Sequence, residues 1–248
     1  KVFEEGKEEE DDEEDDDLVS LSPYSFRFHK IEALDGYILA LDSNQIFSPD
    51  GEQLAWMEGV MERWNGANFR FVAYHNPLYP AGEDDYPEPM RQLLRETWAP
   101  VFDEYKIHYS FEFHTHQYKR TWPLIGGSIA EGGDKVTTRI PADVPGTIYL
   151  GDGCMGVDSH GDLQNRPLPW YLARVSSEQH FIVVDLKLQE EKKERGGVGM
   201  EKGEVVVQAM RDTGHVIDRH LRVVDDKNEE QRKNEKKERE ERREEERK

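Results

Sequence analysis

Three features are scarce or missing in this sequence of 248 residues, and each argues against a class of protein. The single cysteine, Cys154, excludes an internal disulfide framework. No segment approaches the roughly eighteen consecutive apolar residues of a membrane span, so none is predicted. There is also no Asn-x-Ser/Thr acceptor for N-glycosylation, and together with the single cysteine this favours an intracellular location.

Positive charge is the minority, because 33 Lys and Arg face 53 Asp and Glu, for a net charge of -20. This balance argues against nucleic acid as a partner. An acidic block at residues 4–17 predicts that residues 1–20 are a disordered tail or linker. Residues 226–248 are almost entirely charged and lack an apolar seam, which predicts a solvated charged helix; a helix that docks on a partner is the alternative.

Between these ends, residues 21–225 have an ordinary globular composition and are predicted to form one domain. The first half alternates strand and helix patterns, which predicts layered α/β packing. Strands are expected at 22–28, 36–44, 69–74 and 107–113, and helices at 52–63 and 90–105. Later strands at 147–150, 181–188, 204–210 and 216–224 predict an antiparallel sheet, as the second face of a sandwich.

Three of the nine histidines stand apart because each follows a predicted buried strand: His75, His114 and His116. Ligand sites in open α/β sheets collect where strands end, and neutral imidazole suits zinc, iron and other transition metals. On spacing alone, a structural role remains the commoner outcome. The other six are expected to face solvent or make polar contacts: His29, His108, His160, His180, His215 and His220.

Several short motifs occur in a fixed order along the chain. They are Tyr24-Ser25-Phe26, Leu41-Asp42-Ser43-Asn44, Gln53-Leu54-x-Trp56-Met57, His75-x-Pro77-x-Tyr79, His114-x-His116-x-Tyr118-x-Arg120, Gly146-Thr147-Ile148-Tyr149 and Thr213-Gly214-His215-Val216-Ile217-Asp218. In this order they resemble the C-terminal half of the purple acid phosphatase branch of the calcineurin-type metallophosphoesterases. The resemblance covers roughly residues 22–224.

The resemblance implies an α/β fold, the C-terminal half of a metallophosphoesterase αββα sandwich. It also implies a site for two divalent or trivalent metal ions, which would be iron, zinc or manganese. His75 and His114 would bind one ion and His116 the other. Tyr118 would support these ligands without touching the ions, and Arg120 is expected to serve ordinary packing. Two such ions hold a phosphoryl oxygen and generate a hydroxide nucleophile.

The earlier half of the family's site has no counterpart in this sequence. Its Asp-x-His, Gly-Asp-x-x-Tyr and Gly-Asn-His-Glu motifs precede the Tyr-Ser-Phe segment, whereas only an acidic run precedes Tyr24 here. Three imidazoles split between two ions would bind neither tightly, so the chain alone is expected to be inert. Two further departures are Phe113, where the family has glycine, and Lys119, where it has glutamate.

Two functional hypotheses follow. The chain is part of a di-metal phosphoesterase that hydrolyses phosphate monoesters, completed by an N-terminal half that carries the other ligands. Lys1 in place of an initiating methionine suggests that some upstream sequence has been removed, so no targeting signal can be inferred. Alternatively, it is a catalytically dead pseudo-phosphatase that holds no metal and acts as an interaction module in a larger assembly. A cation-buffering role for the acidic residues 8–17 rests on composition alone.

Overall fold

The computed structural model describes residues 27–31, 36–44, 51–82, 87–135, 138–151, 154–158, 167–189, 202–225, 237 and 241–242. The acidic segment at residues 1–20 lies outside these ranges. Of the charged helix predicted at 226–248, only Lys237, Glu241 and Arg242 are described, so that helix is not shown.

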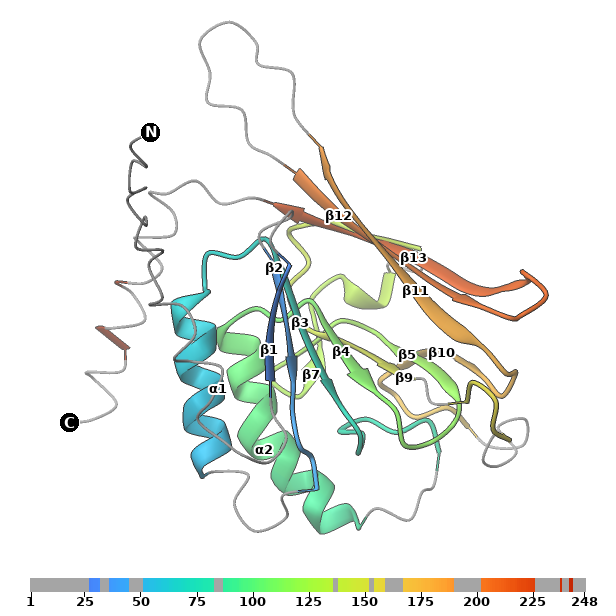
Figure 1. Cartoon of the computed structure of the whole chain (residues 1–248), viewed down its shortest axis with the longest axis horizontal. Coiled ribbons are helices and arrows are strands. Elements are labelled where there is room, and N and C mark those ends of the chain that lie inside the picture. The colour runs from blue at the N-terminus through green and yellow to red at the C-terminus, as the bar shows by residue number, and fades with distance from the viewer. Residues whose placement is uncertain are drawn as a thin grey trace, which may run out of the picture.

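The described chain forms three layers, with two helices, a larger sheet and a smaller sheet stacked in that order (Figure 1). The larger sheet has the strand order β1 (Arg27–Ile31), β2 (Gly36–Ala40), β3 (Phe69–Tyr74), β4 (Tyr109–Glu112), β9 (Ile148–Gly151), β5 (Tyr118–Thr121) and β10 (Leu172–Ser176). Its central strands β2, β3, β4 and β9 are parallel. The helices α1 (Glu52–Arg63) and α2 (Glu88–Glu104) are the crossovers between β2, β3 and β4.

The smaller sheet has the order β11 (Phe181–Gln189), β12 (Lys202–Met210), β13 (Val216–Asp225) and β8 (Arg139–Ile140). Strands β11, β12 and β13 are antiparallel, as the sequence predicted. In chain order, β5 is followed by a short hairpin of β6 (Leu124–Ile125) and β7 (Ser128–Ile129). The 3-10 turn η3 (Gly133–Lys135) then precedes β8. In the part of the chain that the structure describes, no helix is both long and apolar enough to span a membrane.

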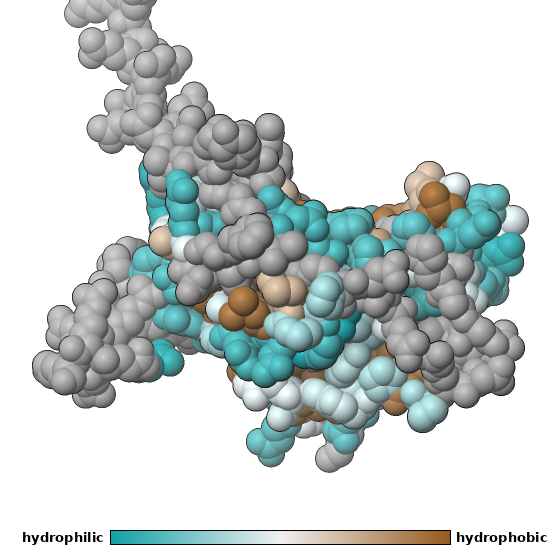
Figure 2. All heavy atoms as spheres, turned by 90° about the horizontal axis from the view of Figure 1, so that it is seen from below, coloured by the Kyte–Doolittle hydropathy of each residue, from teal (hydrophilic) through white to brown (hydrophobic). Residues whose placement is uncertain are grey.

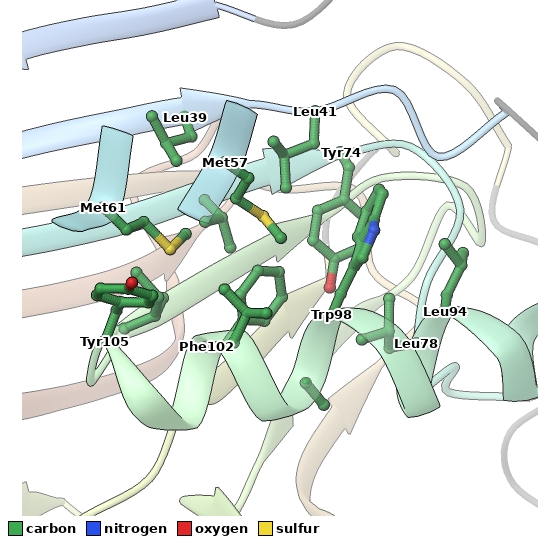
Figure 3. Packing of buried hydrophobic residues seen from close by; sticks show 14 of the residues in the cluster. Leu39, Leu41, Met57, Met61, Tyr74, Leu78, Leu94, Trp98, Phe102 and Tyr105 are labelled. Carbon is green, nitrogen blue, oxygen red and sulfur yellow. The ribbon is translucent and has the colours of Figure 1, made fainter. Parts of the chain in front are cut away.

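One hydrophobic core lies between the helices and the larger sheet, because the buried stripes of α1 and α2 face the same strands. Figure 3 shows Trp98 and Phe102 of α2 beside Tyr74 of β3, with Met57 of α1 close to them and Met61 of α1 beside Tyr105. The rings of Tyr74 and Trp98 meet edge to face at 5.3 Å. This packing fixes β3, and with it the loop that carries His75, against the helical layer.

A second core lies between the two sheets, where alternate apolar residues of β12 meet β3, β4 and β9. Val205 and Val207 of β12 are fully buried there, as are Phe69 and Tyr109 of the larger sheet. A side chain at Gly203 of β12 would meet the Phe69 ring at 2.9 Å, so glycine permits the close approach of the sheets at this point.

Gly146, just before β9, combines a positive φ of 96° with a crowded position, since an added Cβ would lie 2.6 Å from the Leu124 carbonyl oxygen. Gly214 has a similar φ of 82° but open space around it. Gly214→Ala therefore reports conformational strain alone, about 1–2 kcal/mol. We expect Gly146→Ala to lower the free energy of unfolding by about 1–3 kcal/mol more than Gly214→Ala does, in urea titrations. If the two substitutions lower the free energy of unfolding equally, the backbone at Leu124 moves aside for the added Cβ at no energetic cost.

Candidate functional site

The carboxyl ends of β2, β3 and β4 meet at one edge of the larger sheet, where hydrogen bonds hold the loops together. The backbone N–H of Asn76, after β3, donates to Ser43 Oγ after β2 at 2.7 Å, and its side-chain amide donates to Asn44 Oδ1 at 2.7 Å. The carbonyl oxygen of His75 accepts from the backbone N–H groups of Phe113 and His114, at 3.1 and 3.0 Å. These backbone bonds bring the loops after β3 and β4 together.

The loop contacts place two imidazole rings side by side. His114 Nδ1 lies 3.0 Å from His75 Nε2, and the ring centroids are 4.9 Å apart. His116 follows in a left-handed conformation, with a φ of 49°, so the chain turns here rather than continuing β4. A positive φ is uncommon for a residue that is not glycine and concentrates at functional sites.

The pKa of His75 is lowered from its ordinary value. Partial burial disfavours the charged ring, and the charges of His114 and then His116 act in the same direction. His116 is therefore close enough to influence His75 electrostatically. The result favours a neutral His75 imidazole, which is the form that binds metals.

The spacing of the two imidazole nitrogens fits a shared ion. Two nitrogen ligands that each lie about 2.1 Å from one ion, at a right angle or a tetrahedral angle, are roughly 3.0–3.4 Å apart. The 3.0 Å between His75 Nε2 and His114 Nδ1 agrees with this range. The number of donors does not suffice, because among the described residues no group of three or more His, Cys, Asp or Glu side chains is arranged to hold a metal ion.

Glu112, the last residue of β4, is committed to other partners. Its Oε1 accepts from the backbone N–H of Leu78 at 2.7 Å and from the Tyr74 hydroxyl at 2.8 Å, and its Oε2 pairs with Lys119 Nζ. Burial, and then the charge of Glu112, raise the pKa of Tyr74, so this hydroxyl stays protonated and donates. Lys119 also donates to the carbonyl oxygen of Tyr79. Both side chains of the ion pair are fully buried.

The Glu112–Lys119 pair therefore clamps the loop after β3 to the strands β4 and β5. Lys119 reaches Glu112 across β9, where Gly151 lies beside its side chain: an added Cβ at Gly151 would be 2.4 Å from Lys119 Cγ. Glycine at this position leaves room for the lysine stem. Lys119, a departure from the family motif, is thus a buried structural cation beside the histidine loops.

Tyr118 and Arg120 lie on β5 and point to a different partner, Asp218 on β13. The Tyr118 hydroxyl and Arg120 Nε each donate to Asp218 Oδ2 at 2.7 Å. Burial opposes ionisation of Asp218, but the hydrogen bond and charge of Arg120 outweigh it, and the pKa of Asp218 is lowered. The cluster links the two sheets, so Arg120 has a structural role through an ion pair that the sequence did not predict. For Tyr118, supporting the histidines remains a prediction.

The expectation that the other histidines face solvent or make polar contacts is wrong for His220 on β13. It is buried between the sheets with its ring 5.5 Å from Tyr109, and neither ring nitrogen has a hydrogen-bond partner among the described residues. His108 and His180 are buried but make polar contacts, His108 with Arg70 N and His180 with Cys154 Sγ at 3.0 Å.

Of the remaining three histidines, one is exposed and two are not fully described by the structure. His215 is exposed, as expected. His160 and the side chain of His29 lie outside the described residues. The contact between His180 and Cys154 was not expected from the sequence, because the two are 26 residues apart.

The surface around the strand ends is mainly hydrophilic. The parallel strands point toward the lower edge in Figure 1, and Figure 2 shows the molecule from that side, with small and separate apolar areas among the described residues. His75 is exposed at this edge, whereas His114 and His116 are half-buried. These surroundings suit a polar ligand better than an apolar one.

Two motifs in the sequence prove to be structural. Gln53 of α1 accepts from Asp42 N at 2.7 Å and donates to Asp42 O at 3.0 Å, which ties the end of β2 to the helix. Sequence reasoning missed Glu112, although a carboxylate inside an apolar run two residues before His114 was a usable signal. It also missed the partnership of Asp218 with Arg120, for which no local signal exists.

The sequence and the fold are similar to those of known proteins. No protein-family model matches the sequence. It is 27% identical to purple acid phosphatase 1 of Ipomoea batatas over 128 residues, which cover 51% of this chain and 27% of that protein. It is 24% identical to a purple acid phosphatase of Glycine max over 160 residues, which cover 55% and 32%. The chain thus spans about a third or less of the length of these relatives.

A solved structure, purple acid phosphatase PPD1 from yellow lupin (Lupinus luteus) seeds, superposes with a TM-score of 0.58 at 15% identity, covering 80% of this chain and 32% of that one. This likeness confirms the predicted α/β metallophosphoesterase fold. The chain is purple acid phosphatase-like in sequence and fold, and its partial coverage of the relatives agrees with the predicted C-terminal half.

Proposed function

We propose that this purple acid phosphatase-like chain supplies the histidine side of a two-metal site that hydrolyses phosphate monoesters. The proposal rests above all on the 3.0 Å approach of His75 Nε2 and His114 Nδ1 at the carboxyl edge of the sheet. The two residues are 39 apart in sequence, and the backbone bonds from Phe113 and His114 to the His75 carbonyl hold their loops in register.

Each histidine would have a separate task. His75 and His114 would hold one ion through the facing nitrogens, and His116, turned by its positive φ, would face the second. When bound, a pair of iron, zinc or manganese ions would polarise the phosphoryl oxygens and lower the pKa of a bound water. The Glu112–Lys119 clamp would keep the two loops at the right separation, and the lowered pKa of His75 keeps that ring in its ligating form.

A complementary N-terminal part would complete the donor set. Metal ions of this kind take four to six ligands, and carboxylate or amide oxygens are the donors that the histidines lack. The described residues offer no third donor at the pair, and Glu112 is already occupied by Lys119, Leu78 and Tyr74. The relatives have more than half their length outside the matched segment, which leaves room for such a part.

The commitment of Glu112 also favours a second candidate function, a pseudo-phosphatase that acts as an interaction module. The buried Lys119 neutralises the Glu112 carboxylate, which is therefore not free to bind a cation beside the histidine loops. In this case the histidine pair would persist only as a hydrogen bond, and the fold would serve a larger assembly.

The test is metal content and phosphomonoester hydrolysis of the native protein with its complementary part present. We expect transition metal to copurify and a synthetic phosphate monoester to be hydrolysed. His114→Ala should lower metal affinity and turnover by about 100-fold or more, since loss of residues that merely support ligands already costs roughly 10- to 100-fold.

His215→Ala is the matched control, because this exposed histidine lies on the turn before β13, away from the paired rings. It should retain both metal and activity. A preparation without metal and without turnover, although the complementary part is present, would support the interaction module instead.

A further inference from the structure

An exposed carboxamide lies next to the histidine pair, at the end of β2. The strands β2, β3 and β4 are neighbours in the larger sheet, and the loops at their carboxyl ends carry Asn44, His75 and His114 in that order. The Asn44 side chain is exposed, and Asn76, the residue after His75, bonds to it. Asn44 therefore belongs to the same edge of the sheet as the two imidazole rings.

The hydrogen bonds of Asn76 determine which end of the Asn44 amide is free. The backbone carbonyl oxygen of Ser43 can only accept, and it receives a long bond of 3.4 Å from Asn76, so the donating atom is the Nδ2 nitrogen. The same nitrogen lies 2.7 Å from the Asn44 amide, so the Asn44 atom that it meets is the acceptor Oδ1. Among the described residues nothing accepts from Asn44 Nδ2, and its two N–H groups remain for a ligand or water.

The loop that carries Asn44 is anchored on three sides. The backbone N–H of Asn44 donates to Asp42 Oδ1 at 2.9 Å, and Gln53 of α1 bonds to both backbone groups of Asp42. Ser43 and Asn76 are buried, and the Ser43 hydroxyl accepts from the backbone of Asn76. A donor that is already held in place loses little conformational freedom when it binds a ligand.

We propose that Asn44 is a substrate-binding residue, whose Nδ2 donates a hydrogen bond to a phosphoryl oxygen of the bound monoester. The inference rests on the proposed function for the identity of the substrate. A phosphoryl group presents three strong acceptor oxygens, so it matches an amide end that can only donate. The ester would thus be held from the β2 side as well as at the histidines.

The same hydrogen bonds argue against Asn44 as a ligand of the metal ions. Asparagine binds a cation through its side-chain carbonyl oxygen. In Asn44 this oxygen is engaged by Asn76, and the amide nitrogen only donates hydrogen bonds. Substitutions at position 44 should therefore leave the metal content unchanged, in contrast to His114→Ala.

Two cations that border the loop after β3 are already paired. Lys119 is buried against Glu112, and Arg95 of α2 forms an ion pair with Glu88. Their charges are thus largely neutralised inside the protein. Asn44 offers this edge a donor that no such pairing occupies, and a hydrogen bond to a charged acceptor is stronger than one between neutral groups.

Asn44→Asp tests the donor, because aspartate keeps an oxygen for Asn76 and replaces the free N–H groups with a second oxygen. The native protein with its complementary part is titrated with inorganic phosphate by calorimetry, and KM and kcat are measured with a synthetic phosphate monoester. We expect Asn44→Asp to weaken phosphate binding and raise KM by about tenfold or more, with kcat changed by less than about twofold. Metal content and the urea midpoint should stay at the parent values.

Two further variants separate the lost hydrogen bond from the added charge. Asn65→Asp adds the same charge on the turn between α1 and β3, at the amino end of that strand, and should leave phosphate binding and KM unchanged. Asn44→Ala removes the donor without adding charge and should raise KM by about fivefold or more. An effect of Asn44→Asp that Asn44→Ala does not share would mean charge repulsion and would overturn the proposal.

The phosphate titration distinguishes this inference from the proposed function. Turnover that depends on His114 but is the same in Asn44→Asp and Asn65→Asp would overturn the role of Asn44 and sustain the phosphatase. Phosphate binding that Asn44→Asp and Asn44→Ala weaken, in a protein without metal or turnover, would sustain the contact and defeat the phosphatase. A parent protein that neither binds phosphate nor hydrolyses the ester would overturn both.

Discussion

Lys119→Met is expected to lower the free energy of unfolding by about 3–5 kcal/mol, because it leaves the carboxylate of Glu112 buried without its cation. Methionine has a similar length and keeps the contact with Gly151, so the change removes charge more than volume. The loss should appear as a lower midpoint with an unchanged slope in urea titrations of the variant and the parent in the same assembly state.

The double variant Lys119→Met/Glu112→Gln tests whether the loss comes from the unpaired charge. A neutral glutamine keeps an oxygen for Leu78 N and the Tyr74 hydroxyl, so at least half of the stability should return. Lys187→Met, on the exposed face of β11, should change stability by no more than about 0.5 kcal/mol. A single variant as stable as the parent would mean that the Glu112 side chain does not depend on Lys119 as its partner.

The local parts of the fold could be predicted because their patterns are short. Helix α1 and strand β3 have the predicted bounds, Glu52–Arg63 and Phe69–Tyr74, since an apolar stripe or an apolar run marks each element. Helix α2 begins two residues earlier than predicted, at Glu88, because Glu88 and Pro89 suit the first turn of a helix. The position of the three histidines just after β3 and β4 followed from the same patterns.

The parts that could not be predicted depend on contacts between distant residues. The strand β5, with the sequence Tyr-Lys-Arg-Thr, is polar in pattern yet fully buried, because Lys119 pairs with Glu112 and Arg120 with Asp218. Arg120 and Asp218 are 98 residues apart. No periodicity in a single sequence reveals that a charged strand will find a partner for each charge.

The buried His220 predicts acid sensitivity. Burial, with the charge of Arg120 acting in the same direction, lowers its pKa from 6.5 to about 3. The unfolded chain therefore binds a proton near pH 6.5, whereas the folded protein resists it until about pH 3. Stability from this residue is fully present above pH 6.5 and is lost as the pH falls toward 3, by about 1.4 kcal/mol per pH unit.

At pH 4.5 the cumulative loss from His220 should be roughly 3 kcal/mol relative to pH 7.5. Asp103 acts in the opposite direction, because burial raises its pKa to about 6 and its neutral form gains stability as the pH falls from 6 toward 3.8. The net slope of the parent protein therefore mixes several contributions, because the lowered pKa values of His75 and Asp218 also cost stability as the pH falls. Only a comparison with a variant that cannot titrate at position 220 separates them.

His220→Phe provides that comparison, since it preserves a ring beside Tyr109 and removes two buried nitrogens without hydrogen-bond partners among the described residues. At pH 7.5 the free energy of unfolding of the variant should equal that of the parent or exceed it by up to about 1 kcal/mol. At pH 4.5 it should exceed that of the parent by roughly 3 kcal/mol. His215→Phe, at an exposed site, should leave the difference between the two pH values as it is in the parent. If the urea midpoints of His220→Phe and the parent fall by the same amount on acidification, the ring of His220 becomes protonated in the folded protein. The two sheets must then open near His220 to admit water.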